Sequence, residues 1–161
     1  MISRKLVAAS ALAIAFAAHA KPPMPELNIS LEQIGRFETG VFDEGAAEIV
    51  AFDAGSQLLF VINANAKTVD VLDLSDPTNP NLAGMIDVSL DIADTGGINS
   101  VAVHDGLVAV AVEHDNKQAN GWVAFYDVDG NYLAHFAAGA LPDMVTFTPD
   151  GNYVLLSLIH I

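Results

Sequence analysis

The chain has 161 residues, of which 52% are hydrophobic and 16% are charged, a composition that fits one globular domain or a piece of a larger one. Its 20 acidic and 6 basic residues give a net charge of −14. This charge excludes nucleic acid as the expected partner, because a phosphate backbone is neutralised by Lys and Arg, and it disfavours anionic membrane surfaces. The chain has no cysteine, so its stability must come from its core, from closure of its sheets or from bound ions.

The first 20 residues have the organisation of a secretory signal peptide. Arg4 and Lys5 form a basic n-region, residues 6–18 form an alanine-rich apolar region, and Ala18-His19-Ala20 matches the A-x-A pattern of a cleavage site. The alternative is an uncleaved membrane anchor, but the apolar run is short for a span of about 20 residues. We therefore expect a mature chain that starts at Lys21, has no membrane segment and is exported by a bacterium to the periplasm, the cell surface or the medium.

Residues 21–44 are expected to be a lead-in. Pro22, Pro23 and Pro25 disfavour regular structure, as is typical of a linker after a cleavage site. The residues around Ile34–Phe37 predict a strand. In a ring-shaped fold, this strand would close the ring against the last unit.

Residues 45–155 are organised as a unit that recurs at roughly 45–50 residues, which indicates a repeat fold. Each unit contains short runs in which apolar and polar residues alternate, the period-2 pattern of half-buried strands. The expected strands are Ile49–Asp53, Leu58–Ile62, Thr68–Leu74 and Ala83–Val88 in the first unit, Ser100–Val103, Leu107–Val112, Gly121–Val128 and Tyr132–Ala137 in the second, and Met144–Thr148 and Tyr153–Leu155 in the third.

The runs are separated by residues that favour tight turns. Asp105-Gly106 and Asp129-Gly130 are strong hairpin signals because glycine accepts a positive φ. Pro149-Asp150-Gly151-Asn152 predicts a turn inside the third unit, and residues 76–80 predict a loop inside the first. These turns connect neighbouring strands into antiparallel hairpins.

Four up-and-down strands per repeated unit, without any helical periodicity, predict an all-β fold. We expect an incomplete β-propeller of about two and a half four-stranded antiparallel blades. Propellers close with typically four to eight blades, so the remaining blades of a longer chain are the expected partners of these. The alternative is a complete small β-domain in which all the strands form a single sandwich.

The last six residues, Leu156–Ile161, read LSLIHI. This hexapeptide is the translation of a transposon-end adapter used in preparing DNA for sequencing. We therefore interpret residues 156–161 as an adapter translation. The alternative is a natural apolar strand end.

Several segments together resemble one family, the choice-of-anchor I domain family, which is related to mesenchyme-specific cell-surface glycoproteins. The resemblance is carried by Gly40–Val50, Phe60–Ala64, Thr68–Pro77, Asn99–His104, Gly106–Glu113 and Gly139–Met144. It implies a long extracellular propeller of the YVTN type, similar to WD40 propellers, often followed by a sorting or anchoring signal. Some members carry an alkaline-phosphatase-like label. In the family, an acidic loop of the type VANEGEP usually follows the second strand of the third blade, where this chain has Leu156–Ile161.

Three polar residues occupy one position in the three units. Glu48, Asn99 and Asp143 each come just before the first strand of their unit. First strands line the central channel of a propeller, so these side chains are expected to form part of a ring at one mouth of it. Oxygen ligands from several blades suit a hard cation, so we predict a calcium site, which Asp43 and Glu44 would join. The alternative is that these side chains cap strand ends or bond the backbone of the next blade.

The sequence predicts no catalytic residue and no organic cofactor. His104, His114 and His135 do not have metal-ligand spacing, and no nucleophile or phosphate-loop motif is present. Trp122 is interpreted as packing within a blade. An acidic connection between the first two units is interpreted as a solvated loop; its acidic residues are Asp87, Asp91 and Asp94.

Two functions are compatible with these features. The first is an exported propeller that binds a surface or extracellular ligand or acts as a scaffold. The second is a metal-dependent phosphomonoesterase-like hydrolase, in which calcium at the channel mouth would polarise a phosphoryl oxygen. Arg36 and Lys67 are the plausible basic residues for holding a phosphate, and neither lies in a motif.

Overall fold

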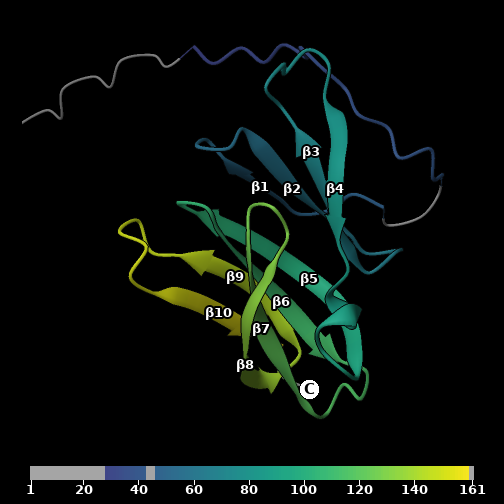
Figure 1. The fold of residues 1–161 in the computed structure, drawn as a ribbon, viewed down its shortest axis with the longest axis vertical. Coiled ribbons are helices and arrows are strands. Elements are labelled where there is room, and N and C mark those ends of the chain that lie inside the picture. Colours follow the sequence, from purple (N-terminus) through teal and green to yellow (C-terminus); the bar gives the residue numbers. More distant parts are fainter. Residues whose placement is uncertain (1–27, 43–45, 160–161) are drawn as a thin grey trace, which may run out of the picture. The chain divides into compact units, whose positions relative to one another are not determined.

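The computed structural model describes residues 28–42 and 46–159 (Figure 1). The chain divides into two units, residues 1–32 and 33–161, and the fold described here is that of the second. The predicted signal peptide and its cleavage site lie outside the described residues. Within the described ranges, no helical segment has the length and hydrophobicity of a membrane span.

The first sheet has four antiparallel strands in chain order. They are β1 (Val50–Asp53), β2 (Leu58–Asn63), β3 (Thr68–Asp73) and β4 (Asn81–Ile86). Val50 pairs with Val61, and Val61 pairs with Asp70, so neighbouring strands meet along their whole lengths. All four strands of the first predicted unit are confirmed.

The second sheet repeats this order with longer strands. They are β5 (Thr95–His104), β6 (Leu107–His114), β7 (Asn120–Asp127) and β8 (Tyr132–Ala140). Asp105 and Gly106 have φ of 46° and 82°, the two positive values that a type I′ turn requires. The Asp-Gly signal thus produced the expected two-residue hairpin between β5 and β6.

The third sheet is a hairpin of β9 (Pro142–Phe147) and β10 (Val154–Leu158). Figure 1 shows β9 and β10 as the last sheet in the chain. The first three residues of the interpreted adapter tail, Leu156–Leu158, belong to β10, and the adapter origin of the tail remains a prediction. In the described residues, two four-stranded sheets and one two-stranded sheet confirm the predicted all-β, antiparallel fold.

The connection between the first two sheets is mostly exposed to solvent, as predicted, but two of its apolar residues are buried. It contains a short 3₁₀ helix, η1 (Val88–Leu90), whose first turn is capped by the Asp87 carboxylate accepting from Ser89 N–H at 3.0 Å. Val88 and Ile92 are buried in the core, while Asp91 and Asp94 are exposed. Two apolar residues at this spacing fix the connection to the sheets on either side.

Two apolar clusters hold the three sheets together. The larger joins the first and second sheets and includes Phe60, Ile62 and Val71 from one and Val110 and Tyr126 from the other. The smaller joins the second and third sheets through Ala109, Ala111, Val123 and Val145. The second sheet is therefore buried on both faces, which explains why β6 is a nearly continuous apolar run.

Residues 28–42 have no regular secondary structure in this structure, so the strand expected near Ile34–Phe37 is not formed here, and its pairing with a last blade remains a prediction. A strand needs a hydrogen-bonded neighbour, and none of the described sheets pairs with this segment. Residues 35–42 instead lie beside the first sheet. Gly35 approaches it so closely that a Cβ would overlap the carbonyl oxygen of Pro77.

Candidate inner-strand groove

The first strands of the three sheets, β1, β5 and β9, line a shared groove. Each is the edge strand of its own sheet, and β5 contacts both β1 and β9. The groove has a volume of about 570 Å³, and its lining consists of residues 49–52, 99–103 and 143–146. We call it the inner-strand groove. It occupies the place where the central channel was expected.

Two of the three predicted ring residues, Asn99 and Asp143, line one end of the inner-strand groove. Glu48 comes immediately before Ile49, which also lines it, and the Glu48 backbone N–H donates to the Ile62 carbonyl at 3.1 Å. Glu48 and Asp143 are both exposed. Asp43 and Glu44, which were expected to join these three, lie outside the described residues.

Asn99 is an extra residue on β5, a β-bulge. Ile98 pairs with Val112 and Ser100 with Ala111, so no residue of β6 is opposite Asn99. A bulge re-aims the side chain of the extra residue. Here the Asn99 side-chain nitrogen donates to Glu113 Oε1 at 2.8 Å and to the carbonyl oxygen of Pro142 in the third sheet at 2.7 Å.

Glu113 is a side-chain partner of Asn99 that the sequence did not reveal. Its side chain is 11% exposed and also pairs with Lys117 Nζ at 3.8 Å. A carboxylate near the end of the apolar run of β6 was the available signal, since buried acidic residues are rare unless they are paired. Among the described residues, no three His, Cys, Asp or Glu side chains gather closely enough to hold a metal ion. The calcium site, which includes an Asn, remains a prediction.

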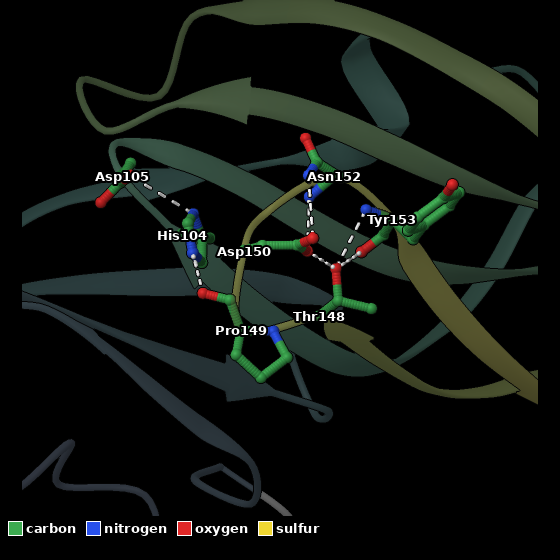
Figure 2. Close-up of polar contacts among 7 residues, drawn as sticks. All are labelled: His104, Asp105, Thr148, Pro149, Asp150, Asn152 and Tyr153. Carbon is green, nitrogen blue, oxygen red and sulfur yellow. Dashed lines mark hydrogen bonds and ion pairs between the residues drawn. The ribbon is translucent and has the colours of Figure 1, made fainter.

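Two further side chains of β5 bind the backbone of the third sheet. The buried Ser100 Oγ accepts from the Val145 N–H at 3.2 Å. His104 Nε2 lies 3.3 Å from the Pro149 carbonyl oxygen, as Figure 2 shows. A carbonyl only accepts, so Nε2 carries the proton in this contact. Together with Asn99, these residues bind the third sheet at three points along β5.

The turn that His104 contacts is ordered by the Asp150 carboxylate (Figure 2). Asp150 accepts from the Thr148 hydroxyl and, at 2.8 Å, from the Asn152 side chain. These hydrogen bonds, with that from Thr148 the largest, lower the Asp150 pKa to about 2. Gly151 has a φ of 69°, and a Cβ there would lie 2.6 Å from His104 Cε1, so glycine is required at this position.

The first sheet contacts the second through the equivalent position of its inner strand. Asp53 is the last residue of β1, and His104 is the last residue of β5. The two positions are equivalent, because Val50 and Val101 occupy matching places in the registers of the two sheets. The hydroxyl and backbone N–H of Ser56 each donate to the Asp53 carboxylate at 2.7 Å. These bonds lower the Asp53 pKa, and the nearby backbone N–H groups of Gly106, in the turn between β5 and β6, and of Gly55 lower it slightly further. The end of each inner strand thus reaches the following hairpin turn.

Two other described histidines, His114 and His135, lie in an aromatic cluster away from the groove lining. His114 stacks on Trp122 with ring centroids 5.2 Å apart, and His135 meets the edge of Trp122 at 6.5 Å. The Tyr132 hydroxyl is 2.7 Å from His135 Nδ1. Trp122 packs against the larger apolar cluster, which confirms its interpretation as a packing residue.

A second hollow of about 650 Å³ lies between residues 35–42 and the first sheet. Arg36 is among its lining residues and forms an ion pair with Glu38 at 2.6 Å. Lys67 lines neither this hollow nor the inner-strand groove. The two basic residues considered for phosphate binding are therefore not brought together at the predicted ring.

Four-stranded antiparallel meanders stacked face to face, with their first strands around a common groove, define the blades of a β-propeller. The family model of the choice-of-anchor I domain matches residues 48–158, and the chain belongs to this family. A similar solved structure is the hydrazine synthase of Kuenenia stuttgartiensis, with a TM-score of 0.56 and 15% identity. The match covers 76% of this chain and 33% of that one, so this chain spans about a third of its length. A search of curated proteins found no match.

Proposed function

We propose that this chain is part of an exported β-propeller that acts as a binding or scaffold module at the cell surface or in the medium. The observation that carries the proposal is the inner-strand groove, which equivalent positions of three repeats build together. Its volume of about 570 Å³ falls within the range of small-ligand sites. Further blades of a longer chain and an extracellular ligand are the proposed partners.

Export is tested by expressing the chain in a bacterium and fractionating the cells. We expect a processed form that starts at Lys21 outside the cytoplasm, because residues 1–20 have the organisation of a signal peptide. A charged residue in the middle of the apolar region, Leu12→Asp, should block processing. An unprocessed chain that stays in the cytoplasm would contradict export.

Binding at the groove is tested by a small-molecule NMR screen on the isotope-labelled chain. Ligands are expected to shift the backbone amide signals of Ile49, Val101 and Met144, which line the groove, and to leave that of Val69, outside the lining, unchanged. Shifts confined to other faces, or no binder at all, would contradict the proposed site.

We further propose that Glu48, Asn99 and Asp143, with Asp43 and Glu44, hold calcium at the groove mouth. Calcium should then raise the melting temperature relative to a chelator, since a ligand that binds the folded state stabilises it. Glu48→Ala and Asp143→Ala should reduce this shift, whereas Asp129→Ala, at a turn outside the groove lining, should keep it. Equal melting temperatures with calcium and chelator would remove the metal site.

The binding module is the single function proposed. A phosphomonoesterase needs a cation beside the metal to hold the phosphate, and the structure gives no specific observation in favour of one. Arg36 pairs with Glu38, and Lys67 is not part of the groove lining.

A further inference from the structure

The first sheet has a face that points away from the second sheet. Val61 on β2 pairs with Val50 on β1 and with Asp70 on β3, and cross-strand partners lie on the same face of a sheet. The chain neighbours of Val61, Phe60 and Ile62, belong to the apolar cluster shared with the second sheet. Because successive side chains of a strand point to opposite faces, Val61 points away from that cluster. We call the side on which Val50, Val61 and Asp70 lie the outer face of the first sheet.

The middle of this outer face is buried. Val61 is 7% exposed, and Leu72, which is two residues beyond Asp70 on β3 and so lies on the same face, is 5% exposed. Both residues line the hollow of about 650 Å³ that residues 35–42 also line. Phe37, within that segment, is half-buried. Residues 35–42 therefore cover β2 and β3 on the outer face, and we call them the strap.

The strap lies where the next blade has a whole sheet. Val110 of the second sheet matches Val61, because Val110 pairs with Val101 as Val61 pairs with Val50. Val110 is fully buried in the apolar cluster that the first and second sheets share. The inner strands differ, since Val101 is 3% exposed and Val50 is 58% exposed. The strap thus covers less of its sheet than a neighbouring sheet does, and it leaves β1 open.

The strap is held loosely. In the described part of the chain, its hydrogen bonds and ion pairs stay within the segment: the Val41 N–H donates to Thr39 Oγ1 at 3.2 Å, and Arg36 pairs with Glu38. Protein interiors contain few voids larger than a water molecule, whereas a hollow of about 650 Å³ remains between the strap and the sheet. The strap can therefore leave the sheet at little cost in hydrogen bonds or close packing.

We propose that the strap is a displaceable cover, which shields the outer face of the first sheet until a further blade packs there. A sheet in this position would also bury Val50 and Phe52, which are 58% and 51% exposed, so burial of apolar surface favours the exchange. The strap overlaps the strand expected at Ile34–Phe37, and its release frees that segment to pair with a last blade. The inference rests on the proposed function and concerns the closure of the same propeller.

Thiol labelling of the full chain tests the strap, because the chain has no cysteine of its own. Three single-cysteine variants are compared: Val61→Cys under the strap, Phe52→Cys on the open part of the same face, and Val110→Cys at the matched position under a sheet. A local opening exposes a thiol without unfolding the sheets, so Val61→Cys should be labelled roughly tenfold or more faster than Val110→Cys. Because the strap covers it most of the time, Val61→Cys should be labelled roughly threefold or more slowly than Phe52→Cys.

A matched pair of glycine variants assigns the protection to the strap. A Cβ on Gly35 would overlap the carbonyl oxygen of Pro77, so Gly35→Ala should lift the strap and bring the labelling rate of Val61→Cys to within about twofold of that of Phe52→Cys. The control Gly84→Ala, which has open space for a Cβ, should leave the rate unchanged. Labelling of Val110→Cys should stay slow in both backgrounds, which shows that the stacked sheets remain folded.

Three results would overturn the inference. If Val61→Cys is labelled as slowly as Val110→Cys, residues 35–42 are a fixed part of the core. If it is labelled as fast as Phe52→Cys with Gly35 in place, the segment does not cover the face, and if Gly35→Ala has no effect, the protection comes from elsewhere. Each result leaves the proposed function standing, because export and groove binding are measured separately by fractionation and NMR. Failure of those two measurements would not change the labelling rates.

Discussion

Replacing Asn99 by alanine is expected to destabilise the contact between the second and third sheets. The side-chain nitrogen donates to the Glu113 carboxylate at 2.8 Å and to the Pro142 carbonyl at 2.7 Å. The variant loses both bonds. It also leaves Glu113, whose side chain is 11% exposed, with the more distant Lys117 at 3.8 Å as its partner.

The loss follows from typical hydrogen-bond contributions. A bond to a charged group contributes about 1.5–3 kcal/mol, and one to a neutral carbonyl contributes about 0.5–1.5 kcal/mol. The free energy of unfolding should therefore fall by about 2–4 kcal/mol. With a urea dependence of about 2 kcal/mol per molar, the unfolding midpoint should fall by roughly 1–2 M.

Urea unfolding can be followed by the fluorescence of Trp122, the single tryptophan of the chain. Asn79→Ala, at an exposed loop position, is the matched control and should change stability by less than about 0.5 kcal/mol. A double-mutant cycle of Asn99→Ala with Glu113→Ala should give a coupling of about 1 kcal/mol or more. A loss below about 0.5 kcal/mol for Asn99→Ala, or no coupling, would refute the reasoning.

Three further predictions concern the hairpin turn of the third sheet and the buried tyrosine. Gly151→Ala should lower the free energy of unfolding in urea by about 1–3 kcal/mol, because Gly151 has a positive φ and its Cβ would meet the His104 ring. The control Gly84→Ala, with open space around it, should be nearly neutral, and equal effects of the two variants would contradict this. The Asp150 carboxylate should titrate by NMR with a pKa of about 2. The stability that it adds is therefore fully present above pH 3.8 and lost as the pH falls through about 2. A pKa near 3.8 would show that the hydrogen bonds of the turn are absent. Tyr126 is buried, and its hydroxyl donates to Asp91 at 3.2 Å. Burial raises the pKa of this hydroxyl, so the folded chain keeps a proton that the unfolded chain loses above pH 10.0. Stability should therefore fall as pH rises above 10.0, and this fall should be smaller in Tyr126→Phe; an identical fall in the variant would argue against a buried hydroxyl.

The strands were predictable because the chain repeats both its period-2 pattern and its turn residues. Asp105-Gly106 produced the type I′ turn that its sequence requires, and the apolar alternation placed β2 and β3 within a residue of their observed ends. Such local signals do not depend on distant parts of the chain. The number of strands per unit and the order of the sheets follow from them.

Features that depend on other parts of the fold were not predictable. Ile34–Phe37 has strand-like residues, but no described sheet edge pairs with it, so it forms no strand. Val88 and Ile92 are isolated apolar residues in an acidic segment, and only the packed sheets reveal that they are buried.

The candidate site was predictable in position but not in its contacts. The repeat alignment placed Asn99 and Asp143 at one end of the groove, as the structure does. The bulge that turns Asn99 toward Glu113 and Pro142 is a one-residue change in register, and no residue type marks it in the sequence. The sequence left open whether these residues bind a cation or the next blade, and the Asn99 nitrogen binds the next blade.

The stacking of successive blades along their inner strands is the claim on which the groove depends. Hydrogen exchange at the Val145 amide tests it most directly. The Thr148 N–H donates to the Tyr153 carbonyl, and pairs alternate along an antiparallel ladder, so the Val145 N–H points away from β10. Its hydrogen-bond partner is the Ser100 hydroxyl of the neighbouring blade. We predict slow exchange at Val145 that becomes much faster in Ser100→Ala, with Thr146 unaffected; exchange at Val145 that is as fast as at exposed loop amides would contradict the stacked blades.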